Sequence, residues 1–134
     1  MNSTNNKLTI QALYQKFLNQ KDFGILDKFL DKDYSERFKE SNMPLLNAFP
    51  DIQFNLKEIF VDNDKVITIY DWTGTHENEY QQISATHKKI TVEGISIYEF
   101  RNGKIVNSIA KPDKLSFFLQ LGVIPSNFKS KISL

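Results

Sequence analysis

Residues 101–122 read RNGKIVNSIAKPDKLSFFLQLG, and they carry the strongest structural signals in the chain. The Asn-Gly pair at 102–103 lies between two apolar-rich runs, which is typical of a tight β-hairpin turn. Pro112 has no amide hydrogen to donate to a sheet, so the second strand is expected to end near it. Asp113 suits the N-cap of a following helix, and Gly122 suits the position just past its end. This stretch predicts strand, turn, strand and helix in succession.

The rest of the chain predicts helices first and strands second. Apolar residues recur at helical spacing over residues 8–18, 22–30 and 43–49. Strand patterns, rich in β-branched and aromatic residues, cover 52–61, 65–75, 88–101 and 104–111. Residues 1–6 are expected to form a frayed polar tail, and residues 34–42 give no clear assignment. This order predicts a single α+β domain over residues 1–134, with helices packed on one face of a curved antiparallel sheet.

Composition excludes several functional classes. The 134 residues carry a net charge of +1 without a basic run, which argues against nucleic acid as a partner. There is no Cys, so disulfides and thiolate chemistry are excluded, and the two His lack metal-ligand spacing. No segment has the apolar length of a membrane span or a signal peptide, so a cytoplasmic protein without membrane association is expected. With 11 Phe, 5 Tyr and 1 Trp, the chain has enough rings for a large core or a ring-lined cavity.

The two longest strands have apolar residues on both of their alternating faces. In 88–101, one set holds Ile90, Val92, Tyr98 and Phe100, and the other holds Ile95 and Ile97. A sheet with one solvated face alternates cleanly instead. Helices can cover one face, so we expect a second copy of the chain to cover the other in a homodimer. The alternative is that the termini fold over that face.

Asp113 is the leading candidate for an acid–base group, and two roles are open to it. As an N-cap it would be ionised and stabilise the helix by about 1 kcal/mol. As an acid or base it would face an apolar cavity, which raises the carboxyl pKa, and move a proton next to a carbonyl. Lys111 shares its strand parity, so the ammonium is expected nearby, where it would lower that pKa or stabilise an enolate. Taken alone, an Asp directly before a helix favours the cap.

The remaining candidates are a histidine and a group of rings. His76 shares parity with Tyr70 and Trp72 and is expected to point inward, either as a hydrogen-bonded strand end or as a proton-handling group. The expected ring walls of a cavity are Tyr14, Phe49, Tyr70, Trp72 and Tyr98. An aromatic core without a cavity is the alternative for these rings. No metal site is expected, because no cluster has suitable ligand spacing.

Five segments carry a resemblance to a known family. They are Ala48-Phe49-Pro50-Asp51-Ile52, Gly74-Thr75-His76, Gly94-Ile95-Ser96-Ile97-Tyr98, residues 102–122, and the helical residues 14–34. In this order they resemble the SnoaL-like polyketide cyclases, which have the nuclear-transport-factor-2-like cone fold. The likeness covers about residues 8–124.

The resemblance implies a deep, cone-shaped pocket between sheet and helices, no cofactor, and one pocket Asp acting as general acid and base. Asp113 matches that position, and His76 falls where the family usually has His. The implied function is a cofactor-independent cyclase or isomerase acting on a small apolar carbonyl compound by intramolecular aldol chemistry. The alternative is a dimeric module of the same fold that binds a small molecule without chemistry, because one fold hosts many functions.

Overall fold

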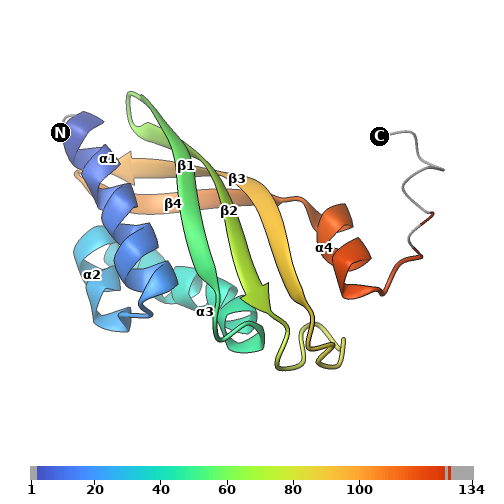
Figure 1. The fold of residues 1–134 in the computed structure, drawn as a ribbon. Coiled ribbons are helices and arrows are strands. Elements are labelled where there is room, and N and C mark those ends of the chain that lie inside the picture. Colours follow the sequence, from blue (N-terminus) through green and yellow to red (C-terminus); the bar gives the residue numbers. More distant parts are fainter. Residues whose placement is uncertain (1–2, 126, 128–134) are drawn as a thin grey trace.

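The computed structural model describes residues 3–125 and 127, and it has the expected α+β architecture (Figure 1). The helical elements are α1 (Ser3–Ala12), a π-helix η1 (Leu13–Asn19), a short 3₁₀ turn η2 (Phe23–Ile25), α2 (Leu26–Phe29), α3 (Lys32–Ala48) and α4 (Lys114–Leu121). The strands are β1 (Gln53–Asp62), β2 (Lys65–Thr75), β3 (Lys89–Arg101) and β4 (Lys104–Pro112). Helices α1 to α3 gather along the sheet, while α4 lies apart at the end of β4.

One antiparallel sheet has the strand order β1-β2-β3-β4, so every strand pairs with its neighbours in sequence. The predicted turn between β3 and β4 is present: Asn102 (φ 53°) and Gly103 (φ 77°) both adopt the left-handed conformation of a two-residue hairpin. The register of β1 against β2 shifts between Leu56 and Glu58, where the sequence pattern was irregular. A second shift follows Glu99 in β3. Bulges of this kind increase strand bending and twist, which curves the sheet around the helices.

The N-terminal half corrects two expectations. Helix α1 begins at Ser3, so residues 3–6 are not a frayed tail, and the Asn6 side chain is buried. The segment 34–42 is helical, because α3 runs unbroken from Lys32 to Ala48 with Pro44 inside it. The prediction that a separate helix begins at residue 43 was therefore wrong about where the helix begins. Pro44 costs one helical hydrogen bond, and burial of the α3 face against the core outweighs that cost.

The two faces of the sheet have different environments. On β3 the even-numbered residues are buried beneath the helices, and the odd-numbered ones point outward. Outward-facing apolar side chains stay substantially exposed: Phe60 (51%), Ile95 (46%), Ile97 (36%) and Ile109 (48%). The pairing places Phe60, Ile67, Ile97 and Ile109 in one row across all four strands. Within the described residues no terminal segment buries this row. The alternative of folded-over termini also concerns residues 1–2, 126 and 128–134, which lie outside the described residues.

Candidate functional site

A cavity of about 510 Å³ opens between the inner face of the sheet and the helices. All five tyrosines of the chain line it, as do three other aromatic side chains. The tyrosines come from η1, α3, β2, the β2–β3 loop and β3, and they are Tyr14, Tyr34, Tyr70, Tyr80 and Tyr98. The volume is within the range of small-molecule sites, about 300–1,000 Å³.

A directed chain of hydroxyl groups forms the deep wall. Tyr98 Oη donates to Tyr14 Oη at 3.0 Å, and Tyr14 Oη lies 2.9 Å from Thr68 Oγ1. Thr68 Oγ1 in turn donates to the carbonyl oxygen of Ser96 at 3.4 Å, so Tyr14 donates to Thr68. Ser96 Oγ is 3.5 Å from the hydroxyl of Tyr70. The buried hydroxyls therefore satisfy one another within the protein, as buried polar groups require.

Burial keeps these phenols protonated. Desolvation raises the pKa of Tyr14 to about 12, although its hydrogen bonds to Thr68 and Tyr98 partly oppose the shift. Burial raises the pKa of Tyr98 well above its usual value, and it also raises the pKa of Tyr70. At neutral pH the deep wall is consequently neutral. It can donate hydrogen bonds, but it supplies no base.

The mouth of the cavity is polar and holds one charge. Arg37 places its guanidinium carbon 5.1 Å from the centre of the Tyr34 ring. Tyr34 Oη lies 2.6 Å from Ser108 Oγ, which fixes the ring against β4. Among the described residues that line the cavity, Arg37 is the only charged one, and no Asp, Glu or His is present.

Four of the five predicted ring residues, Tyr14, Tyr70, Trp72 and Tyr98, lie on the cavity wall. Phe49 does not: it is fully buried, 5.0 Å from the Trp72 ring and outside the cavity lining. It supports the wall from behind, which corrects its expected contact with a ligand. The strand parities of residues 70, 72 and 98 predicted their direction correctly because these residues lie inside regular strands.

Asp113 caps α4. Its Oδ1 accepts a hydrogen bond from the Ser116 amide at 3.0 Å, and the residue is exposed and outside the cavity lining. Lys111 is also exposed, and it pairs with Ile95, whose side chain points to the outer face. The expectation that Lys111 stands beside a pocket carboxylate was therefore wrong, since the residues of β4 that pair with inward-facing residues of β3 and line the cavity are Ser108, Ala110 and Pro112.

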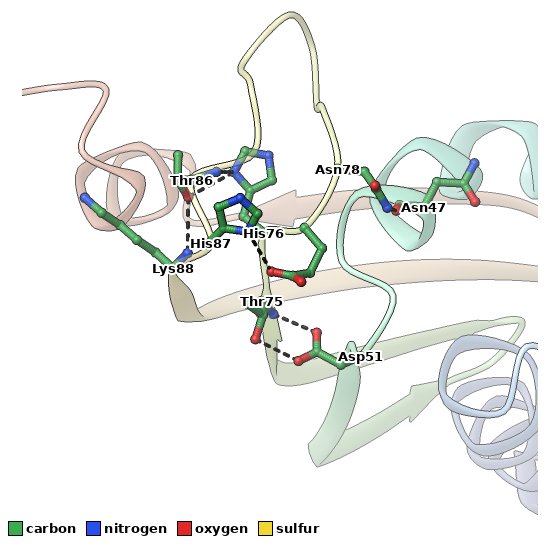
Figure 2. Close-up of polar contacts among 9 residues, drawn as sticks. Asn47, Asp51, Thr75, His76, Asn78, Thr86, His87 and Lys88 are labelled. Carbon is green, nitrogen blue, oxygen red and sulfur yellow. Dashed lines mark hydrogen bonds and ion pairs between the residues drawn. The ribbon is translucent and has the colours of Figure 1, made fainter.

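His76 lies just beyond the end of β2, next to Thr86 (Figure 2), and it does not line the cavity. Its ring is fully buried and stacked on Phe49, with 5.2 Å between centroids and 19° between planes. Nδ1 accepts a hydrogen bond from the Thr86 amide at 3.2 Å, so the neutral ring carries its proton on Nε2. That Nε2 is buried with no partner among the described residues, and burial lowers the His76 pKa. The ring secures the β2–β3 loop and is not placed to act on a ligand.

Sequence reasoning missed the α3 side of the cavity. Tyr34, Arg37, Phe38, Ser41 and Leu45 all line it, and they recur at three- and four-residue spacing along one helix face. That spacing was the available signal.

No cluster of three or more His, Cys, Asp or Glu that could hold a metal ion occurs among residues 3–125 and 127. In the same part of the chain, none of the helices has both the length and the apolar character needed to cross a membrane.

Residues 8–121 match the family model of the SnoaL-like polyketide cyclases. The chain belongs to this family.

Solved structures with the same fold span nearly the whole chain. A proposed SnoaL-like polyketide cyclase from Jannaschia sp. CCS1 superposes with a TM-score of 0.84 at 15% identity, covering 91% of this chain and 94% of that one. TsrD from Streptomyces laurentii gives 0.84 at 18%, covering 92% and 99%. A SnoaL-like polyketide cyclase from Agrobacterium tumefaciens C58 gives 0.73 at 18%, covering 84% and 95%. At these identities the likeness establishes the fold. A comparison with curated proteins finds no match.

Proposed function

We propose that this SnoaL-like protein binds a small, planar, ring-containing compound in the tyrosine-lined cavity and does not catalyse a reaction of that compound. The observation that carries the proposal is the composition of the wall: five tyrosines, Trp72 and two Phe line it, and no carboxylate or imidazole is among the described lining residues. Aromatic walls contribute large contact area and favour planar ligands. General acid–base chemistry needs a group that changes protonation near neutral pH, and the buried phenols stay protonated.

A fluorescent probe tests binding directly. N-phenyl-1-naphthylamine is neutral, planar and emissive in apolar sites, and Trp72, the single tryptophan, lies in the wall as an internal reporter. Ser108→Phe narrows the mouth, where Ser108 is half-buried beside Tyr34. We expect it to weaken probe binding about tenfold or more, equivalent to ~1.4 kcal/mol. Asn55→Phe, an exposed change on β1 outside the cavity lining, is the control. Equal affinities for wild type and Ser108→Phe would refute the proposal.

Catalysis by Asp113 is the second candidate, and one observation favours it. Pro112, the residue immediately before it, lines the cavity, so a rotated Asp113 side chain would be at the rim. Its carboxylate would take a proton from a carbon next to a carbonyl, and the enolate carbon would attack a second carbonyl of the same molecule. The new C–C bond leaves an alkoxide, which recovers the proton from Asp113. This route requires the carboxylate to release the Ser116 amide.

Hydrogen–deuterium exchange separates the two candidates without a known substrate. The carbon next to the carbonyl of 1-tetralone exchanges slowly in D₂O, and NMR follows the exchange. Binding alone predicts no acceleration by the wild-type protein. Acceleration that is lost in Asp113→Asn would instead establish the catalytic role. The Asn substitution suits this test because Asn is as good an N-cap as Asp, so α4 stays capped.

We also propose that the outer face of the sheet pairs with a second copy of the chain. The exposed row of Phe60, Ile97 and Ile109 is bordered by charged pairs on both sides. Lys57 contacts Glu93 at 3.3 Å on one side, and Lys65 contacts Glu99 at 3.9 Å on the other. An apolar centre with a polar rim is the usual anatomy of a protein interface.

Sedimentation measures the oligomeric state. Ile97→Glu puts a charge in the centre of the row, and we expect the dimer to dissociate into folded monomers. Thr91→Glu, also on the outward side of β3 but away from the row, should leave the dimer intact. A wild-type protein that sediments as a monomer at high micromolar concentration would refute the dimer.

A further inference from the structure

We propose that the ligand is a planar acid whose anionic group pairs with Arg37 at the mouth of the cavity while its rings lie among the tyrosines. The proposal rests on the binding function above and names the chemical class of the ligand. The shared chemistry is a carboxylate or sulfonate attached to an aromatic system. It follows from the distribution of charge around the cavity.

Arg37 is a cation without an anionic partner among the described residues. None of the ion pairs within the described residues includes it, and no carboxylate lines the cavity. Within the described residues, its guanidinium makes a cation–π contact with the Tyr34 ring. Such a contact positions the guanidinium but leaves its charge unneutralised. An anion at the mouth would meet this positive charge, and none of the described residues that line the cavity carries a carboxylate to oppose it.

The Tyr34 ring gives Arg37 a fixed support. The Tyr34 hydroxyl is held at 2.6 Å by Ser108 Oγ, and its ring packs 5.9 Å from the Phe38 ring. Tyr34 is buried, whereas Arg37 is exposed to solvent. A guanidinium resting on a rigid aromatic ring loses less conformational freedom on binding than a free side chain, which favours a specific contact.

Neighbouring polar side chains on α3 are already engaged. Ser41 Oγ and Asn42 Nδ2 both donate to the Phe38 carbonyl oxygen, at 2.9 and 2.8 Å. Deeper in the cavity the tyrosine hydroxyls donate to one another and to Thr68. The guanidinium of Arg37 is thus the one charged donor at the cavity, and no acceptor from the described part of the chain pairs with it. Guanidinium groups bind planar anions in a bidentate manner, and this geometry matches a carboxylate or a sulfonate.

Two fluorescent probes of similar shape test the inference. 8-Anilino-1-naphthalenesulfonate carries a sulfonate, and N-phenyl-1-naphthylamine is its neutral counterpart. The variant is Arg37→Gln, and the control is Arg101→Gln, which removes the only other arginine at the end of β3, outside the cavity lining. Both variants change the net charge equally, so a general electrostatic effect appears in both.

The expected result is selective. Arg37→Gln should weaken binding of the sulfonate probe about 5- to 30-fold, the range for a charge-assisted hydrogen bond at a partly exposed site. It should change binding of the neutral probe less than about twofold. Arg101→Gln should change neither. Arg37→Lys should recover part of the sulfonate affinity, and added salt should weaken the sulfonate probe more than the neutral one.

Other outcomes overturn the inference in distinguishable ways. Equal weakening of both probes by Arg37→Gln would assign Arg37 a structural role on Tyr34. No weakening of either probe would make it a solvated surface residue. In both cases binding of the neutral probe would still support the proposed function. If the neutral probe does not bind the wild-type cavity at all, the proposed function fails, and this inference fails with it.

Discussion

Gly94→Ala tests how closely the β3 backbone approaches the cavity wall. Gly94 pairs with Tyr70 on β2, and the Tyr70 ring lies directly over it. A Cβ atom at position 94 would lie 2.6 Å from Tyr70 Oη and 2.7 Å from Cζ. Nonbonded heavy atoms prefer about 3.5–4.0 Å. The ring must therefore move by about 1 Å, and Tyr70 lines the cavity.

The change in unfolding free energy caused by Gly94→Ala is the sum of two opposing effects. Overpacking of this kind costs about 1–3 kcal/mol of unfolding free energy. Replacing Gly by Ala within a strand recovers roughly 0.5–1 kcal/mol of backbone entropy. We expect a net loss of about 1–2 kcal/mol, which corresponds to a fall in Tm of about 4–8 °C for a domain of this size. Affinity for N-phenyl-1-naphthylamine should fall as well, because the ring is displaced from its place in the wall.

Chemical denaturation and a double-mutant cycle with Tyr70→Leu measure the effect. Leu lacks the three closest atoms of the ring, so Gly94→Ala should cost at least about 1 kcal/mol less in that background. Gly24→Ala is the matched control, since its nearest atom is Asp22 Oδ1 at an ordinary 3.5 Å, and it should be neutral or slightly stabilising. The same cost in both backgrounds, or no cost in the wild type, would refute the close approach.

Three further predictions concern protonation. Burial lowers the His76 pKa below the unfolded value of about 6.5. The free energy of unfolding should therefore be unaffected by His76 above pH 6.5 and should fall as the pH drops below that value. Urea unfolding should show this loss reduced in His76→Gln but not in His87→Gln. The Thr75 amide lowers the Asp51 pKa, so Asp51→Ala should cost about 0.5–1 kcal/mol at pH 7. That difference should disappear as the pH falls below about 3.8, through the lowered pKa. Alkaline titration followed by phenolate absorption should show Tyr14 ionising only near pH 12. Burial also raises the pKa of Tyr70 and Tyr98, so the test is the amplitude: a step near pH 12 as large in Tyr14→Phe as in the wild type would contradict the assignment.

The sheet and the last helix were predictable because their signals are local. Two residues with positive φ at 102–103 close a hairpin whatever surrounds them, and Pro112 ends a strand by lacking a donor. Asp113 and Gly122 then cap α4 as expected, with the Ser116 amide bound to Asp113 and a left-handed Gly122. Each of these features depends on the chemistry of one or two residues.

Helix α3 was not predictable in the same way. Its polar composition and Pro44 both disfavour a long helix, and they are outweighed by burial of Tyr34, Phe38 and Leu46 against other elements. The spacing of these residues indicates a helix face, but how strongly that face is buried depends on tertiary contacts that the sequence pattern does not give. Because the helix was not predicted, part of the candidate site was missed as well: α3 supplies Arg37 and one side of the cavity.

Strand parity predicted which side chains face the cavity inside the strands, but not beyond the ends of the strands. Tyr70 and Trp72 lie within β2 and point into the cavity, whereas His76 follows the last residue of β2 and turns into the core against Phe49. Asp113 likewise follows the last residue of β4 and turns back to its own helix. A period of two holds only while the backbone stays extended. Both candidate acid–base groups stood one residue past that limit.

The hydrogen bonding of the wall shapes how this cavity can select a ligand. The hydroxyls of Tyr14, Tyr34 and Tyr98 all have partners within the protein, so a ligand need not satisfy them. Ligand affinity at the deep wall then comes from ring burial, which discriminates weakly between compounds of similar shape. Discrimination requires a polar group that is left unpaired when the wrong ligand binds. Under the proposal that the ligand is a planar acid, Arg37 would be that group, and selectivity for an anion and contact with rings would be divided between two ends of one cavity.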